Sequence, residues 1–141
     1  MDFNYKHMAK FPSDEWAKEY TEKLNSNPAY AEAGKTWDDS LTFVVQPDET
    51  YNDSWYLYLN LKAGKCIDSK VGKAESDVPK ATFKYMGKYS NWVKLIKGEI
   101  DPIQGLMTGK FKLDGSMMKI MRYTNAAKEM VNTAKMVDSQ F

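Results

Sequence analysis

The spacing of hydrophobic residues along the chain changes from a helical period to a strand period and back again. Near the N-terminus Trp16, Tyr20 and Leu24 recur at every fourth position behind Ser13, which predicts an amphipathic helix with a serine cap. Further along, apolar and polar residues alternate, most clearly in WYLYLNL (residues 55–61), as expected of a strand with one face in the core. The same criteria predict strands at residues 41–46, 66–72, 81–87 and 110–115, and further helices at residues 28–33, 89–97, 102–108 and 117–137.

The order of these elements indicates the fold class. Helices lie at both ends and in one connection, whereas the first strands are joined by turns that favour antiparallel pairing. The sequence therefore predicts an α+β fold, in which a five-stranded, mostly antiparallel sheet is covered on one face by helices. A chain of 141 residues fits one domain of this kind.

Methionine gathers at the start of the predicted terminal helix. Ser116 is the expected cap, and Met117, Met118 and Met121 follow within five positions. A continuous apolar stripe is predicted along this helix, formed by Met117, Ile120, Met121, Thr124, Ala127, Met130, Val131, Ala134 and Val137. Because methionine is flexible and polarisable, the stripe indicates either an irregularly packed core or an adaptable apolar binding surface.

The overall charge and the cysteine content narrow the function classes. Twenty basic residues nearly balance nineteen acidic ones, so the net charge is +1 and no nucleic-acid partner is expected. Cys66 is the only cysteine, which argues against a disulfide framework and favours a cytoplasmic location. The start of the sequence lacks the apolar core of a signal peptide, and no segment approaches the roughly 20 apolar residues of a membrane-spanning helix.

Few residues offer catalytic chemistry, and we predict no enzymatic activity. His7 is the only histidine and precedes the first predicted element, so Cys66 has no structured base beside it. Asp38 and Asp39 are adjacent in an expected turn, and Asp101 is the expected cap of a short helix. No glycine-rich phosphate loop follows a strand, and neither a metal nor a cofactor is expected.

The segment from residue 81 to 121 resembles the C-terminal half of the sterol carrier protein family of lipid-binding domains. The similarity lies in an aromatic strand followed by ordered glycine and proline breaks: Gly87-Lys88-Tyr89, Gly98-x-x-Asp101-Pro102, Leu106-Met107-x-Gly109-Lys110 and Gly115-x-Met117. A weaker similarity extends over residues 13–72. The resemblance implies a single lipid-binding domain at residues 13–141 after an N-terminal extension at residues 1–12, with a hydrophobic tunnel between sheet and helices. It implies no metal, cofactor or catalytic residue.

The function that this resemblance implies is the non-catalytic binding or transfer of a fatty acyl chain, a sterol-like molecule or another apolar ligand. The tunnel is expected to be lined by Phe83, Trp92, Leu95, Ile96, Ile103, Leu106, Met107, Phe111, Leu113, Met117, Met118, Ile120 and Met121. Its polar end is expected to be formed by Gln104, Asn91 and Tyr123.

Two alternatives remain open at this point. The chain could present an apolar substrate to a partner enzyme, or its apolar seam could hold a partner helix or a second copy in a homodimer. Tyr51, Tyr56 and Tyr58 are expected to be exposed aromatic residues that would suit such a protein interface. Contact with membranes is expected to be transient at most, because no strongly basic amphipathic helix is present in the sequence.

Overall fold

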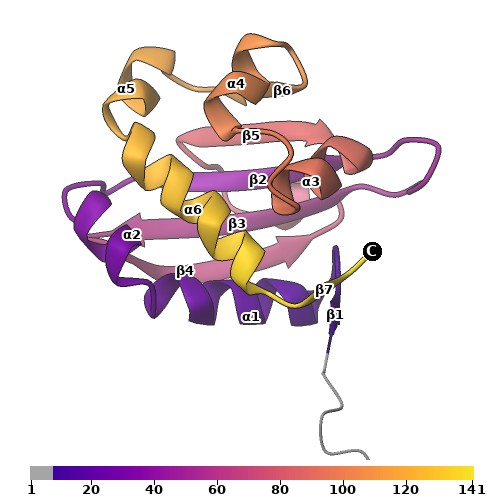
Figure 1. The fold of residues 1–141 in the computed structure, drawn as a ribbon, viewed down its shortest axis with the longest axis horizontal. Coiled ribbons are helices and arrows are strands. Elements are labelled where there is room, and N and C mark those ends of the chain that lie inside the picture. Colours follow the sequence, from indigo (N-terminus) through magenta and orange to yellow (C-terminus); the bar gives the residue numbers. More distant parts are fainter. Residues whose placement is uncertain (1–7) are drawn as a thin grey trace, which may run out of the picture.

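One layer of helices lies across a five-stranded sheet in the computed structural model, which describes residues 8–141 (Figure 1). The strands are β1 (Ala9–Lys10), β2 (Ser40–Gln46), β3 (Trp55–Lys62), β4 (Lys65–Gly72), β5 (Phe83–Lys88), β6 (Phe111–Asp114) and β7 (Ser139–Gln140). The helices are α1 (Asp14–Asn25), α2 (Pro28–Ala33), the 3-10 turn η1 (Glu75–Asp77), α3 (Tyr89–Ile96), α4 (Pro102–Met107), α5 (Met117–Arg122) and α6 (Thr124–Met136).

The sheet confirms the predicted fold class. Its order is β4-β3-β2-β5-β6, and only the central β2–β5 pair is parallel. The register places Leu57, Phe43, Tyr85 and Leu113 directly opposite one another across four neighbouring strands. Because paired residues point to the same face of a sheet, this row faces the helices as one apolar band.

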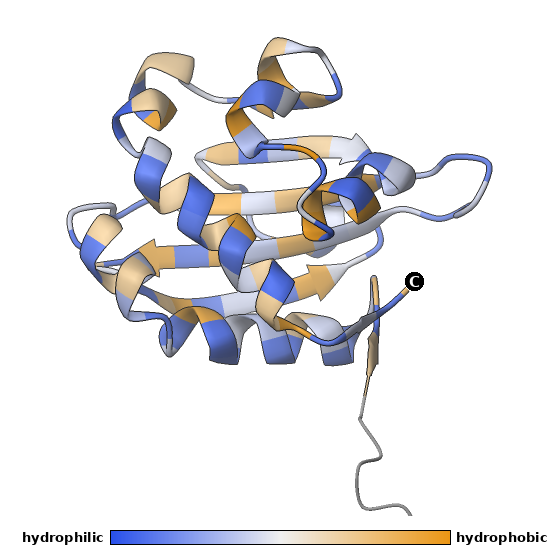
Figure 2. Cartoon of the chain, in the orientation of Figure 1, coloured by the Kyte–Doolittle hydropathy of each residue, from blue (hydrophilic) through white to orange (hydrophobic). Residues whose placement is uncertain are grey.

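Local capping explains where the first helices begin. The Ser13 hydroxyl accepts a hydrogen bond of 3.0 Å from the Trp16 amide at the start of α1, as predicted. Asn27 caps α2 in the same way, through the amides of Ala29 and Tyr30. α1 carries hydrophilic residues along its outer edge (Figure 2), while its apolar side packs inward. No helix within residues 8–141 is both long and apolar enough to cross a bilayer.

The prediction of one continuous terminal helix is wrong, because the helix breaks at Tyr123. The Tyr123 ring stacks on Trp37 at 5.1 Å, and its hydroxyl donates a hydrogen bond of 3.2 Å to the Thr36 carbonyl oxygen. The Thr124 hydroxyl also donates to the Met121 carbonyl oxygen at 2.7 Å. These contacts hold the chain out of helical geometry at one residue, so α5 and α6 run in different directions (Figure 1).

The first described residues pack against the end of the chain. β1 pairs in parallel with β7, and Ala9 and Phe11 are buried. The Phe11 ring meets the Trp16 ring edge-on at 4.8 Å. Part of the segment expected as an N-terminal extension therefore contributes to the core, whereas His7 lies outside the described residues.

The connection from β4 to β5 lies against the sheet face opposite the helices. Lys84 points to that face and forms ion pairs with Glu75 of η1 and, at 3.4 Å, with Asp114. Thr42 and Tyr58 on the same face are buried. The expectation of an exposed Tyr58 is therefore wrong, and Tyr51 and Tyr56 are only half-exposed.

Candidate functional site

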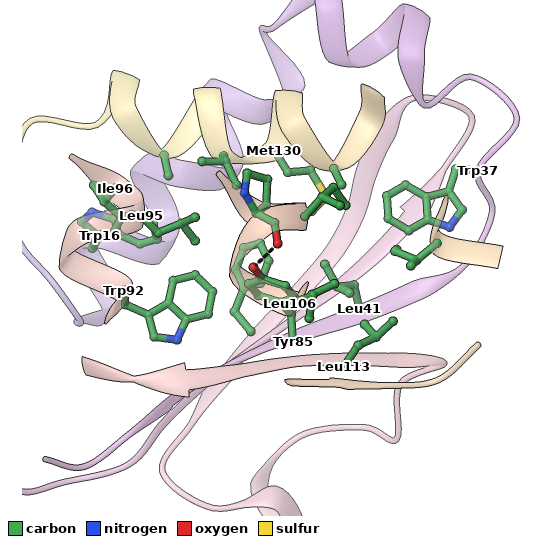
Figure 3. A pocket seen from close by; sticks show the side chains of 17 residues that line it. Trp16, Trp37, Leu41, Tyr85, Trp92, Leu95, Ile96, Leu106, Leu113 and Met130 are labelled. Atoms are coloured by element: carbon green, nitrogen blue, oxygen red, sulfur yellow. Dashed lines mark hydrogen bonds between the residues drawn. The ribbon is translucent and has the colours of Figure 1, made fainter. Parts of the chain in front are cut away.

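An apolar cavity of about 40 Å³ lies between the helical layer and the sheet (Figure 3). It lies against α1, α3, α4, α5 and α6 and against the strands β2, β5 and β6. Its lining residues are Trp16, Trp37, Leu41, Phe43, Tyr85, Trp92, Leu95, Ile96, Pro102, Ile103, Leu106, Leu113, Ile120, Ala127, Met130, Val131 and Ala134.

The pairing register of three strands builds the floor of this cavity, and regular spacing along one helix builds its roof. Phe43, Tyr85 and Leu113 form the floor, because they belong to the row of paired residues that faces the helices. The roof comes from α6, where lining residues recur with the period of one helix face. These roof residues are Ala127, Met130, Val131 and Ala134.

Tryptophans close the two ends of the cavity, with Trp37 at one end and Trp16 at the other (Figure 3). The Trp37 indole donates a hydrogen bond of 3.1 Å to the Asp39 carboxylate, which also pairs with Lys119 at 2.9 Å. The Trp16 indole donates to the Ser139 hydroxyl at 2.7 Å. Each ring is therefore fixed by a polar contact outside the cavity, so that its apolar face is available to the interior.

The remaining polar atoms of the lining are also paired within the protein. Trp92 donates a hydrogen bond of 2.9 Å to the Val44 carbonyl oxygen, and Tyr85 donates one of 2.7 Å to the Pro102 carbonyl oxygen (Figure 3). Burial, together with the nearby charge of Asp101, raises the pKa of Tyr85 and keeps its hydroxyl protonated. None of the described lining residues carries a charge. The interior therefore suits a hydrocarbon rather than an ion.

The structure brings seven of the predicted tunnel residues together around the cavity. These are Trp92, Leu95, Ile96, Ile103, Leu106, Leu113 and Ile120. Phe83 and Phe111 are buried in the sheet outside the lining, and Phe111 stacks on Tyr85 at 4.7 Å. The four predicted methionines are not in the lining either: the exposed fractions of Met107, Met117, Met118 and Met121 are 82%, 47%, 74% and 44%.

The three residues expected at a polar end also lie outside the cavity lining. Gln104 is exposed on α4. The Asn91 side-chain amide donates to the Lys110 carbonyl oxygen at 3.2 Å, and Tyr123 stacks on Trp37. Tyr123 thus contributes to the end wall through Trp37 rather than through its own hydroxyl.

Sequence reasoning missed both end walls, most of the floor and the roof of the cavity. The lining residues Leu41, Phe43 and Tyr85 had been assigned to the buried faces of strands, which is the signal that identifies them. The roof residues had been placed in the helical stripe but not in the site. Trp16 had been placed on the apolar side of the first helix and not in the site, because the place of Trp16 and Trp37 at the cavity depends on how distant elements pack.

Cys66 is a free, buried cysteine outside the cavity lining. Burial raises the pKa of Cys66 to about 11, so the thiol is protonated at neutral pH, and it donates to the Asp68 carbonyl oxygen at 3.2 Å. Within residues 8–141 no three histidine, cysteine or acidic side chains are grouped so that they could hold a metal ion.

Comparison with known proteins agrees with this geometry. The profile of the SCP-2 sterol transfer family matches residues 13–128. The chain is similar to a crystal structure of sterol carrier protein 2, with 30% identity and a TM-score of 0.83 over 91% of this chain and 99% of that one. No curated protein sequence is significantly similar to it.

Two further solved structures share the fold. One is a conserved hypothetical protein from Thermus thermophilus, described as possibly a sterol carrier protein, with 30% identity and a TM-score of 0.82 over 96% of this chain and 94% of that one. A palmitated SCP2L2 from Aedes aegypti, at 10% identity and a TM-score of 0.56 over 82% and 94% of the two chains, shows the fold alone. The family profile and the relatives at 30% identity together confirm the resemblance in the sequence, and the chain belongs to the SCP-2 sterol transfer family of lipid-binding and lipid-transfer domains.

Proposed function

We propose that the cavity holds the apolar part of a lipid and that the protein binds or transfers this lipid without changing it chemically. The observation that carries the proposal is the lining: it consists of hydrocarbon and aromatic surface, and each of its polar side-chain atoms already has a protein partner. A catalytic site would need a base, a nucleophile or a polarising group directed at the substrate. A fatty acyl chain or a sterol-like ring system needs only apolar walls.

The cavity in this structure is a contracted form of the proposed site. A volume of about 40 Å³ has room for roughly three water-sized groups, and a cavity of about 150 Å³ is needed to hold one benzene molecule. Binding of an acyl chain therefore requires the helices to move away from the sheet. Each buried methylene stabilises the complex by about 0.8 kcal/mol, which offsets the costs of opening and association as the chain enters.

α4 is the element that we propose moves. This short helix contributes Pro102, Ile103 and Leu106 to the wall. Gly98 and Gly109 flank it with φ values of 84° and 76°, a region of backbone conformation that glycine adopts without strain. The hydrogen bond from Tyr85 to Pro102 fixes the start of α4 to the sheet, so this bond has to break or shift when the helix opens.

The partner enzyme, the homodimer and the cytoplasmic location stay predictions. An accessory role would place the same pocket beside a catalytic protein that accepts the bound molecule. Co-purification of a stoichiometric enzyme would favour that role over free exchange of lipid. A doubled mass in solution at micromolar concentration would favour the homodimer.

Native mass spectrometry followed by solvent extraction tests the proposal. The protein as purified is expected to carry a fatty acid, phospholipid or sterol-like molecule, and the delipidated protein is expected to bind palmitate at micromolar concentration with displacement of a fluorescent fatty acid. Palmitate is a suitable first ligand because the Aedes aegypti relative is palmitated. A ligand-free mass, with no displacement by fatty acids, phospholipids or sterols, would contradict a lipid-binding function.

A further inference from the structure

α5 is a short part of the cavity wall that buries little of its own surface. Within this helix only Ile120 is buried and only Lys119 is partly buried, whereas the other residues are exposed. The helix lies at one corner of the molecule, beyond the start of α6 (Figure 1). The backbone changes direction on both sides of it, at Gly115 with a φ of 128° and at the break at Tyr123. A tilt of α5 as a unit therefore breaks few contacts.

Two neighbouring side chains of α5 reach inward. Ile120 contributes to the cavity lining. The Lys119 ammonium group lies 2.9 Å and 3.1 Å from the two carboxylate oxygens of Asp39. The Lys119 side chain is 44% exposed and the Asp39 side chain only 13%, so water reaches this ion pair mainly from the lysine side. The pair thus joins α5 to a carboxylate that is largely buried.

Asp39 connects this ion pair to the sheet and to the end wall of the cavity. It directly precedes β2, and its carbonyl oxygen accepts a hydrogen bond of 2.9 Å from the Leu61 amide, which fixes its backbone to the sheet. Its carboxylate also accepts the hydrogen bond from the Trp37 indole. Tyr123, at the end of α5, stacks on the same indole. α5 is therefore fastened at the Trp37 end of the cavity, through Lys119 and through Tyr123.

We propose that α5 is a flap over the Trp37 end of the cavity and that the Asp39–Lys119 ion pair is its latch. A lipid larger than the void has to displace the wall that α4 and α5 both line. Lifting α5 withdraws Ile120 from the cavity and separates Lys119 from Asp39. Because dissolved salt screens the attraction between these two charges, ionic strength then controls how often the flap opens. This control of lipid exchange rests on the proposed function, since it concerns the same cavity.

Stopped-flow release of palmitate from the full-length protein tests the latch. Lys119→Gln and Asp39→Asn each remove the ion pair, and asparagine keeps an oxygen that can accept the hydrogen bond from Trp37. A third variant combines the two substitutions. Lys128→Gln is the matched control, because Lys128 is an exposed lysine on the neighbouring helix α6. None of these three positions lines the cavity. Release is measured at low and at high salt.

Each single variant should release palmitate about 1.5- to 5-fold faster than the wild type at low salt, the range expected for a partly exposed ion pair. The double variant should be no faster than the single variants, because both substitutions remove the same contact. High salt should accelerate release from the wild type and from Lys128→Gln, but not from the variants that lack the pair. Wild-type release rates in both single variants, or additive effects in the double variant, would overturn the proposal.

The equilibrium affinity distinguishes a latch from damage to the cavity. A latch that forms in the closed protein, whether empty or occupied, slows entry and release by the same factor. Lys119→Gln should therefore accelerate association as much as dissociation and leave the palmitate affinity unchanged. A weaker affinity with an unchanged association rate would overturn the proposal, since Lys119 would then stabilise the bound lipid rather than control its passage.

Amide hydrogen exchange of the delipidated protein separates this proposal from the proposed function, because it requires no lipid. Exchange in α5 and at the Trp37 indole should be faster in Lys119→Gln than in the wild type or in Lys128→Gln, while β3 exchanges equally in all three. This result in a protein that does not bind palmitate would support the flap and contradict the proposed function. Unchanged exchange in α5, together with normal palmitate binding, would contradict the flap alone.

Discussion

Replacement of Ala127 by leucine tests whether a lipid lies beneath α6. Ala127 is one of the small roof residues, and its side chain faces a void of about 40 Å³. Leucine adds three carbon atoms, which is about what a void with room for roughly three water-sized groups can hold. If the added carbons take the place of three ligand methylenes, at about 0.8 kcal/mol each, palmitate binding weakens by about 2.4 kcal/mol or roughly 50-fold.

The same substitution should leave the folded protein nearly as stable as before. Filling the void gains apolar contact, while imperfect fit costs about 1–3 kcal/mol, so we expect the free energy of unfolding to change by no more than about 1 kcal/mol. The assays are displacement of a fluorescent fatty acid by palmitate and urea unfolding followed by circular dichroism. Ala29→Leu, on the exposed side of α2, is the matched control and should change neither quantity. Wild-type palmitate affinity in a stable Ala127→Leu protein would refute the proposal that the acyl chain lies under α6.

Three other substitutions follow from the walls of the cavity and from the loops around it. Tyr85→Phe removes the hydrogen bond to Pro102. It should lower the free energy of unfolding by about 1 kcal/mol and speed palmitate exchange in stopped-flow measurements. An unchanged exchange rate would count against α4 as the moving element. Burial alone would raise the pKa of Asp48, but hydrogen bonds from Ser90 and the Asp48 loop lower it to about 2. The stabilisation by this carboxylate is therefore present above its unfolded pKa of about 3.9 and is lost as the pH falls towards 2. Urea unfolding of the wild type and of Asp48→Asn should show that their difference in free energy of unfolding shrinks over that range. A difference that stays constant with pH would contradict this. A Cβ added at Gly109 would meet no atom within 4 Å, but the residue has a φ of 76°. Gly109→Ala should therefore lower the free energy of unfolding by about 1–2 kcal/mol from backbone strain alone. An unchanged urea midpoint would show that this turn relaxes.

The strands could be predicted because their side-chain period is a local property of the sequence. WYLYLNL appears in β3 with Leu57 and Leu59 fully buried, as the alternation indicates. The helix caps at Ser13 and Asp101 could also be predicted from local sequence, because each cap bonds to backbone amides only two or three residues away. The floor of the cavity follows directly from these elements once the strand order is known.

The direction of the last helices could not be predicted from local patterns. The break at Tyr123 depends on Trp37, which lies 86 residues earlier in the sequence. Met121 and Met130 are nine positions apart, which is half a turn out of phase in a helix of 3.6 residues per turn, so the predicted stripe was too wide to form one buried face. In the structure Ile120 faces the cavity while Met117 and Met121 are exposed. Apolar residues that the period assigned to the core thus became a surface.

The end walls depend on tertiary packing in the same way. Trp16 reaches one end of the cavity because α1 packs against α6, and its indole is held by Ser139 from the opposite end of the chain. Trp37 reaches the other end through its contacts with Asp39 and Tyr123. No spacing in the sequence predicts that Trp16 and Trp37 close the two ends of one cavity.

The four tryptophans provide the most direct test that a lipid occupies the cavity. Trp16, Trp37 and Trp92 line it, whereas Trp55 does not. We would titrate delipidated, nitrogen-labelled protein with palmitate and follow the four indole N–H signals by NMR. The account predicts large, saturable shifts for the three lining tryptophans and a much smaller change for Trp55. Shifts confined to exposed residues, or no shifts at all at saturating palmitate, would contradict the central claim that this cavity is the lipid site.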